Sequence, residues 1–337
     1  MIGDRSMNDE IMVSIKCLTY NHEKYIAKML EGCLAQKVNF KYEIIVHEDA
    51  STDNTATIVR EYEKKYPDII VPIYEKENQY SSGSIEHVNN MIYQRAKGKY
   101  IAFCEGDDYW IDNTKLQRQV DFLEHHPECS FCFHDAIVIW ENGKKSGNFF
   151  PDKIIKNRMW KNRDISYNAG QLIELGFIPT ASIVGRKEFV RKIRTFCANE
   201  ICGDLPLRLS LSMDGMGHYI NRRMSVYRSG NPSSASGQAQ SSYDNMMKTY
   251  KGHCDILRAF DGMTKQVWHK EVVHDMKKRL LRTLMIAQKS NLIKEYGLSE
   301  MFWKETTIQW KVKYFIHKYF ASFYELLRML RNRVKGI

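Results

Sequence analysis

Hydrophobic and polar positions alternate in short blocks along the first 125 residues. Runs rich in β-branched residues predict strands at residues 12–18, 42–47, 69–74 and 99–104. The spacing of apolar positions predicts helices at residues 23–34, 86–96 and 115–125, and another from Ser51 or Thr52 to Tyr66. Strands that alternate with helices in this way predict an α/β fold with a mostly parallel, Rossmann-like central sheet flanked by helices.

The pattern becomes less regular after Trp140. Apolar runs predict a buried strand at residues 129–140 and another strand at residues 176–184, followed by a helix from Arg186. Residues 229–242 are rich in Ser and Gly and predict a flexible loop, and almost all of the chain beyond them has helical spacing. We therefore expect an α/β domain at residues 10–235 and a helical C-terminal extension at residues 243–337.

The amino-acid composition indicates a globular protein without a membrane-spanning segment. Hydrophobic residues make up 43% of the 337 residues and charged residues 27%, as in ordinary globular proteins. No stretch approaches the roughly 18 uncharged apolar residues of a membrane span, and the N-terminus lacks the pattern of a secretory signal. We therefore expect a cytoplasmic protein without a disulfide framework. Cys129 and Cys132 have a CxxC spacing but lie in an apolar run, which favours core packing over metal binding.

Polar residues follow three of the predicted strands. They are Thr19-Tyr20-Asn21 after the first, Glu48-Asp49 after the second and Glu105-Gly106-Asp107-Asp108 after the fourth. Ligands of parallel α/β sheets bind beyond the carboxyl ends of the strands. Three carboxylates within four residues repel one another unless a cation such as Mg²⁺ or Mn²⁺ binds there. A solvated acidic turn is the alternative for this segment taken alone.

The first two loops carry groups that suit a nucleoside. The ring of Tyr20 can stack on a base, and the carboxylate of Asp49 can accept a hydrogen bond from the ring N–H of uracil, a contact that discriminates strongly. A packing tyrosine and a turn stabilised by the Asp49 side chain are the alternatives.

Together these loops, with Ala96–Ile101 before the acidic segment, resemble the inverting glycosyltransferases of family 2, which have the GT-A fold. The resemblance implies that Tyr20 and Asp49 contact the nucleobase. It places Thr19, Asn21, Glu23 and Glu105 in the nucleotide-sugar site, and it implies that Asp107 and Asp108 hold Mn²⁺ or Mg²⁺ and the ribose-diphosphate. Two positions depart from the family pattern, because Glu105 replaces the usual aspartate and Ala50 the usual glycine.

The second half contains further candidates by the same resemblance. Residues 199–207 resemble a later family motif whose carboxylate deprotonates the acceptor hydroxyl, which assigns that role to Asp204. A helix N-cap before Leu205-Pro206 is the alternative. Arg228 precedes the Ser- and Gly-rich stretch and suits a segment that closes over the diphosphate.

Two residues after the acidic segment are candidates for acceptor binding. Trp110 and Asp112 can line an acceptor pocket, because an aromatic face packs well on a sugar. Core packing is an equal alternative for Trp110. His218 is a conceivable third metal ligand, but a lone histidine is more often structural, so no role is assigned to it.

The net charge of +10 is concentrated at the C-terminus. Residues 301–337 contain eight Lys or Arg and two Glu, interleaved with aromatic residues. This composition suits an anionic membrane surface, where lipid-linked acceptors are found. The apolar residues do not form one clean stripe, so packing on the protein's own core, or against a second copy in a homo-oligomer, is the alternative. No nucleic-acid-binding motif accompanies the charge, so nucleic acid is not an expected partner.

The expected function is metal-dependent transfer of a sugar from a nucleotide-sugar donor, UDP-linked by our interpretation. The acceptor is a hydroxyl of a glycan or a lipid-linked sugar in surface polysaccharide synthesis, at the inner face of the membrane. A sugar-nucleotide pyrophosphorylase would need a Gly-rich phosphate loop near the first strand, and Thr19–His22 is not one. A non-catalytic carbohydrate-binding or membrane-scaffold protein on the same fold is the alternative. Asp107, Asp108 and Asp204 argue against it.

Overall fold

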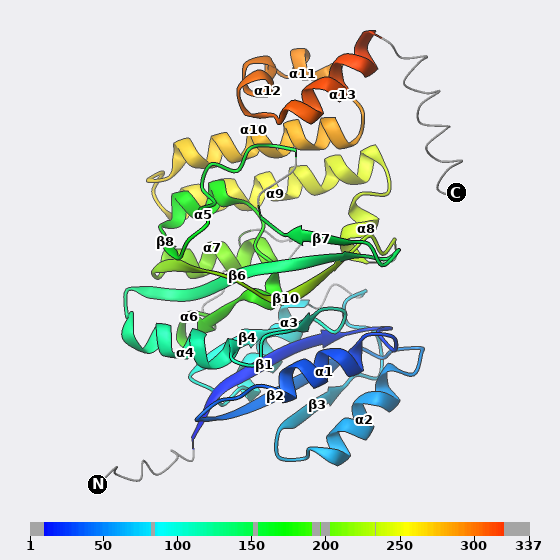
Figure 1. Ribbon diagram of the computed structural model, residues 1–337, viewed down its shortest axis with the longest axis vertical. Coiled ribbons are helices and arrows are strands. Elements are labelled where there is room, and N and C mark those ends of the chain that lie inside the picture. Colours follow the sequence, from blue (N-terminus) through cyan, green and yellow to red (C-terminus); the bar gives the residue numbers. More distant parts are fainter. Residues whose placement is uncertain are drawn as a thin grey trace.

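The computed structural model describes residues 10–81, 85–150, 154–190, 196, 203–232 and 234–319. Within these residues the strands form one sheet in the order β3-β2-β1-β4-β9-β6-β10-β5, with β7 paired to β6 and β8 to β10. The helices of the C-terminal extension are stacked at one end of the molecule, away from β1 to β3 (Figure 1).

The first half follows the sequence prediction closely. Its strands are β1 (Ile11–Thr19), β2 (Lys41–Glu48), β3 (Ile70–Tyr74) and β4 (Tyr100–Phe103), and β1 pairs in parallel with both β2 and β4. The helices are α1 (Ile26–Leu34), α2 (Thr55–Lys65), α3 (Ile85–Arg95) and α4 (Lys115–His125). One detail is wrong: Asn54, rather than Ser51 or Thr52, precedes α2, because those two residues bond to the loop after β1.

The second half differs more from the prediction. Its strands are β5 (Tyr109–Trp110), β6 (Cys129–Trp140), β7 (Lys145–Asn148), β8 (Ile165–Tyr167), β9 (Val184–Arg186) and β10 (Met216–Ser229). Its helices are α5 (Ala169–Leu175), the 3₁₀ turn η1 (Thr180–Ser182), α6 (Lys187–Val190), α7 (Asp204–Met213) and α8 (Ala235–Ala239). The strand expected at residues 176–184 is therefore mainly a turn before β9, and the expected loop at 229–242 contains α8.

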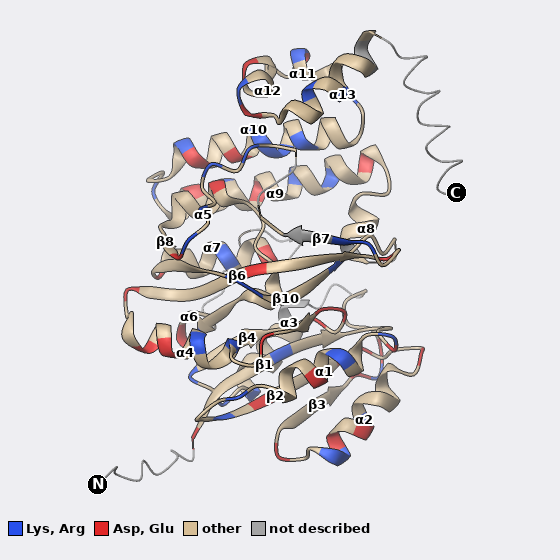
Figure 2. Ribbon diagram, in the orientation of Figure 1, with Lys and Arg blue, Asp and Glu red and all other residues tan. Residues whose placement is uncertain are grey.

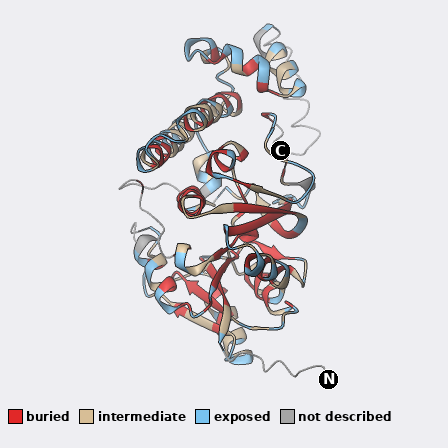
Figure 3. Ribbon diagram, turned by 90° about the vertical axis from the view of Figure 1, so that its left-hand side faces the viewer, coloured by how far each residue is buried: buried red, intermediate tan, exposed pale blue. Residues whose placement is uncertain are grey.

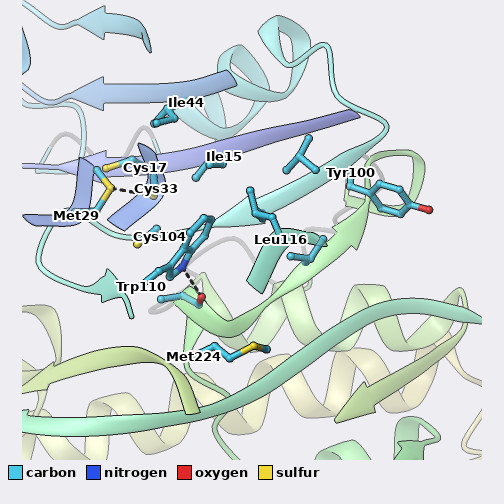
Figure 4. Packing of buried hydrophobic residues seen from close by; sticks show 14 of the residues in the cluster. Ile15, Cys17, Met29, Cys33, Ile44, Tyr100, Cys104, Trp110, Leu116 and Met224 are labelled. Carbon is cyan, nitrogen blue, oxygen red and sulfur yellow. Dashed lines mark hydrogen bonds between the residues drawn. The ribbon is translucent and has the colours of Figure 1, made fainter. Parts of the chain in front are cut away.

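Two hydrophobic clusters cover the two faces of the sheet, whose strands are largely buried (Figure 3). Alternate residues of a strand point to opposite faces. Ile15 and Cys17 of β1 and Ile44 of β2 therefore pack with Met29 of α1 and Leu116 of α4 (Figure 4). The opposite face packs against α3, α5 and α7. Cys129 and Cys132 are fully buried in β6 without a disulfide, which confirms the core interpretation.

The described part of the extension, residues 243–319, is mostly helical, as predicted. It contains α9 (Tyr243–Met263), α10 (His269–Ile286), α11 (Leu292–Glu295), α12 (Ser299–Glu305) and α13 (Ile308–Tyr319). Ile256, Leu257 and Phe260 of α9 share a hydrophobic cluster with α5 and α7, so the extension packs directly on the α/β unit. The expected division at residues 235 and 243 remains a prediction. Among the described residues, no helix is both long and apolar enough to cross a bilayer.

Candidate active site

The loops after β1 and β2 bind each other at the carboxyl edge of the sheet. The backbone N–H of Asn21 donates to Ser51 Oγ at 3.0 Å, and the N–H of Thr52 donates to Asn21 Oδ1 at 2.8 Å. The N–H of Glu23 donates to Asp53 Oδ2 at 3.1 Å. Asn21 has a φ of 54°, a left-handed conformation that asparagine tolerates because its short polar side chain can hydrogen-bond locally. These bonds order the two loops as one unit.

The acidic segment packs closely on the loop after β1. The N–H of Gly106 donates to the carbonyl of Leu18 at 3.0 Å. A Cβ atom at Gly106 would lie 2.6 Å from both Thr19 Oγ1 and His22 Nδ1, so only glycine fits without a shift of that loop. Because Gly106 has no side chain, the acidic segment can lie close to the loop after β1.

Tyr20 and Asp49 lie at the same edge but in different environments. Tyr20 is 41% exposed, whereas Asp49 is 6% exposed. The two carboxylate oxygens of Asp49 accept the backbone N–H groups of Gln79, at 2.7 Å, and Tyr80, at 3.0 Å. Asp49 thus anchors the segment after β3, and its contact with a nucleobase remains a prediction.

Glu105 lies near a buried lysine. Lys16 Nζ donates to Asn89 Oδ1 at 2.5 Å and lies 5.2 Å from the centre of the Tyr93 ring. Burial lowers the pKa of Lys16 to about 8, although the nearby negative charge of Glu105 acts to raise it. Burial also raises the pKa of Glu105 to about 7, and Lys16 opposes that shift. Sequence reasoning missed Lys16, which lies within an apolar strand pattern.

Asp108 joins the acidic segment to β10. It is 4% exposed, and its Oδ1 accepts the backbone N–H of Arg228 at 2.9 Å. Burial and the nearby charge of Asp107 raise the pKa of the Asp108 carboxyl well above its usual range. The Arg228 guanidinium lies over the rings of Tyr25, at 4.4 Å, and Tyr109, at 5.5 Å. Its Nε is buried and has no hydrogen-bond partner among the described atoms.

Asp107 and Arg228 line a small cavity of about 50 Å³. A larger cavity of about 400 Å³ lies next to it, and the two share Tyr25, Glu141 and Asn231. Tyr25 Oη donates to Glu141 Oε1 at 3.2 Å across the boundary between them. The larger cavity is lined also by Asn21, Glu23, Lys24, Asp53 and Pro232. The cleft therefore runs from the loops after β1 and β2 to the segment after β10.

Sequence reasoning missed Tyr25 and Glu141, although both line the cleft. Tyr25 lies two residues after the predicted Glu23, and this is the only signal for it in the sequence. Glu141 lies at the end of β6, where the hydrophobic pattern becomes irregular, so no signal points to it.

Asp204 is brought to the same region as the acidic segment. It is the first residue of α7, and Gly203 rather than Asp204 is the N-cap, so the N-cap alternative is wrong. Burial raises the pKa of Tyr227, and the charges of Asp108, Asp107 and Asp204 add to that shift. The charge of Asp204 also contributes to the raised pKa of Glu105. The charge of Asp204 thus acts on the region of Tyr227 and Glu105, and its role as a base remains a prediction.

The two acceptor candidates have structural contacts. Trp110 is 3% exposed and its Nε1 donates to the carbonyl of Ala181 at 2.9 Å, which corresponds to the core-packing alternative. Asp112 Oδ1 accepts the N–H of Thr114 at 2.8 Å, in the turn before α4. Acceptor binding stays a prediction for both residues.

His218 lies outside the cleft. Its Nδ1 is 2.8 Å from Ser166 Oγ and its ring stacks on Phe122, so its contacts in the structure are packing contacts.

The carboxylates of the site fit a cation that binds together with phosphate. Among the described residues, no group of three or more His, Cys, Asp or Glu side chains is arranged to hold a metal ion by itself. Asp107 lines the cavity, and the buried carboxylate of Asp108 is bonded to the backbone of Arg228, which also lines it. Mg²⁺ is commonly held by one or two carboxylates plus substrate phosphates rather than by a protein cage. The residues present therefore fit such an ion in a ternary site with a diphosphate.

Solved structures share this architecture. TarS of S. aureus in complex with UDP-GlcNAc aligns with a TM-score of 0.58 and 17% identity, covering 86% of this chain and 78% of that one. The mannosyltransferase PcManGT of Pyrobaculum calidifontis, in complex with GDP-Man and Mn²⁺, aligns with a TM-score of 0.50 and 16% identity, covering 92% and 85%. The predicted GT-A fold is confirmed.

Sequence relatives agree with the fold. An uncharacterised protein of Mycobacterium tuberculosis is 37% identical over 216 residues, 64% of this chain and 58% of its own length. The E. coli UDP-Glc:α-D-GlcNAc-diphosphoundecaprenol β-1,3-glucosyltransferase WfgD is 30% identical over 154 residues, 46% of this chain and 57% of its own. This chain thus spans less than two thirds of the length of these relatives. The profile described as Glycosyl transferase family 2 matches residues 14–194, more than half of the chain. The chain belongs to glycosyl transferase family 2.

Proposed function

We propose that this protein transfers a sugar from a UDP-sugar to a hydroxyl of a glycan or lipid-linked acceptor in surface polysaccharide synthesis, with inversion at the anomeric carbon. The observation that carries the proposal is the cavity lined by Asp107 and Arg228, with Asp108 bonded to the Arg228 backbone. Carboxylates for a cation and a guanidinium for phosphate border one space, as a diphosphate leaving group requires.

The donor nucleoside occupies the larger cavity in this proposal. The exposed ring of Tyr20 is available for stacking on the base, and Asn21 and Glu23 line the cavity wall. Thr19 and Asp49 are buried at the same edge of the sheet, and Asp49 holds the segment after β3. The choice of UDP is supported by TarS, which binds UDP-GlcNAc, and by WfgD, which uses UDP-Glc.

Asp107 and Asp108 would hold Mn²⁺ or Mg²⁺, with the diphosphate oxygens as further ligands. The ion would offset the negative charge that develops on the leaving diphosphate. The Arg228 guanidinium, held between Tyr25 and Tyr109, supplies a second positive charge there. Burial and the charge of Asp107 raise the pKa of Asp108, so a bound cation would stabilise its ionised form.

Asp204 acts as the general base. Inverting transfer needs one base on the side of the sugar opposite the leaving group. Asp204 comes from a different part of the fold than Asp107 and Asp108, yet its charge acts on Tyr227 and Glu105 at the cleft. It would accept the proton of the acceptor hydroxyl while the diphosphate departs.

The acceptor in this proposal is linked to a lipid at an anionic membrane surface. WfgD acts on a diphosphoundecaprenol-linked sugar. In this chain most of the positive charge lies in residues 301–337, which suits the electrostatics of a membrane that contains such lipids.

A thermal-shift screen tests the proposal. The full chain is mixed with UDP-, dTDP- and GDP-sugars, each with and without Mn²⁺. We expect a UDP-sugar to raise the melting temperature only with Mn²⁺, and to be slowly hydrolysed. Asp108→Asn should lose the shift, whereas Asp255→Asn on the exposed face of α9 should keep it. Absence of binding and hydrolysis with every donor would favour the non-catalytic alternative.

A further inference from the structure

Helix α13 carries a continuous apolar stripe on its outer face. Ile308 is 74% exposed, Val312 52%, Phe315 51% and Tyr319 59%. Their spacing of four, three and four residues puts all of them on one side of a helix. Trp303 of the preceding α12 is 57% exposed and adds a large aromatic ring. We call these five residues the α13 face.

The opposite side of α13 packs on the protein. Trp310 and Tyr314 pack against the hydrophobic cluster of the extension, and the Tyr314 ring lies 4.6 Å from the ring of Phe302. The sequence alone had not revealed a clean stripe because the apolar residues of these two sides are interleaved along the chain. Tertiary packing separates an inner face, which anchors the helix, from an outer face whose side chains are about half exposed or more.

Positive charge borders this apolar face. The described side chains of α13 include Lys311 and Lys313 and no acidic residue, and Lys304 on α12 is exposed. Figure 2 shows Lys and Arg residues along the helices of the extension. The Lys313 ammonium lies 4.2 Å from the Trp310 ring centre, at the margin between the two faces. The sequence that continues from α13, residues 320–337, has four Lys or Arg and one Glu. The face and its continuation are thus both apolar and cationic.

We propose that the α13 face docks on the surface of an anionic lipid bilayer, with α13 lying in the plane of the interface. This inference rests on the proposed function and names the surface by which the enzyme would reach a lipid-linked acceptor. Apolar side chains with lysines beside them suit the boundary between acyl chains and anionic headgroups. With its 12 residues α13 is about 18 Å long, too short to cross a hydrocarbon core of about 30 Å.

Charge also argues against a second copy of the chain as the occupant. Two α13 faces brought together would place their lysines against one another, and like charges across an interface disfavour association. An anionic bilayer provides both the apolar phase and the opposite charge.

Vesicle sedimentation of the full chain tests the proposal. We expect binding to vesicles of phosphatidylcholine with phosphatidylglycerol, weakened by added salt, and little binding to phosphatidylcholine alone. The double variant Val312→Ser, Phe315→Ser should lower the affinity by about tenfold or more, because less apolar area is buried in the interface. Both side chains are half exposed, so the fold should tolerate the change. The matched control Met263→Ser, Val267→Ser, also at exposed positions, should bind as the wild type does.

Three outcomes would overturn the proposal. The first is equal vesicle binding by the double variant and the wild type. The second is a dimer, measured by light scattering, that the double variant converts to monomers. The third is vesicle binding only after residues 320–337 are removed, which would identify that segment as the cover of the face. Hydrolysis of a UDP-sugar in solution is measured in parallel. Lost vesicle binding with retained hydrolysis separates a membrane defect from a failure of the proposed activity.

Discussion

Asp108 Oδ1 accepts a hydrogen bond from the backbone N–H of Arg228 at 2.9 Å, across 120 positions of sequence. The bond continues the pairing of β5 with β10, in which Tyr109 faces Val226. It fixes the candidate metal-binding carboxylate relative to β10, the strand that carries the candidate phosphate-binding arginine. One strand pair therefore positions both ends of the proposed diphosphate site.

The substitution Asp108→Asn should weaken Mn²⁺-dependent UDP binding without lowering the stability of the fold. Asp108→Asn keeps an oxygen acceptor for the Arg228 N–H but removes the charge, so we expect Mn²⁺-dependent UDP affinity to fall by about 10²-fold. Its thermal stability should be equal or higher, because the buried carboxyl has a raised pKa. Asp108→Ala should also lose about 1–3 kcal/mol of stability, since the buried N–H is left unpaired. Calorimetric titration and thermal unfolding measure both effects, and undiminished UDP binding by the Asn variant would contradict the metal role.

Asp204→Asn should affect transfer but not donor binding. Loss of a general base lowers transfer by about 10²–10⁴-fold. Because Asp204 lies on α7, apart from the loops that line the nucleotide cavity, the affinity for UDP should stay within about twofold. Transfer to an acceptor and equilibrium UDP binding are measured on the same preparation. Full transfer activity would remove Asp204 from the mechanism.

Gly106→Ala should disrupt the nucleotide site through the loop after β1. The added methyl group would lie 2.6 Å from Thr19 Oγ1 and His22 Nδ1, so the loop must move. We expect a loss of about 1–3 kcal/mol in stability and weaker UDP binding. Gly262→Ala on the exposed side of α9 is the matched control, because no described atom lies within 4 Å of a Cβ atom there. The prediction fails if the two variants unfold at the same urea concentration and bind UDP alike.

Arg228→Met should weaken diphosphate binding selectively. The methionine can fill the space between Tyr25 and Tyr109 but has no charge for phosphate. UDP affinity should fall by about tenfold or more while uridine affinity is unchanged, because uridine has no diphosphate. Competitive binding of the two ligands measures the difference, and an equal loss for both would point to a distorted cleft instead.

Lys115 should make stability depend on pH in the alkaline range. Burial lowers its pKa from 10.5 to about 8, although the nearby cysteines act to raise it. Between these values the unfolded chain binds more protons than the folded one, so the contribution of Lys115 to stability rises with pH, by up to about 3 kcal/mol. Below pH 8 the buried Lys115 lowers the free energy of unfolding by a constant amount. Lys115→Met should therefore be more stable than the wild type at pH 7, and its advantage should shrink towards pH 10 in urea unfolding.

The sequence alone determined most of the first half of the fold. β-Branched runs and helical spacing are local patterns, and they located β1 to β4 and α1 to α4 within a few residues. Because the carboxyl ends of parallel strands meet at one edge, it also followed that Thr19, Asp49 and Asp107 would lie close together. These inferences need no knowledge of distant contacts.

Only the tertiary structure decided the rest. The charged residues within β10 hide its strand pattern, so its pairing with β5 and β6, and with it the Asp108–Arg228 bond, could not be foreseen. Trp110 has the same side chain whether it faces a sugar or the core, and its neighbours in space decide that it is buried. The aromatic residues of α13 form two faces only once one side packs on Phe302. Burial depends on contacts between segments far apart in the chain, and a local pattern does not contain them.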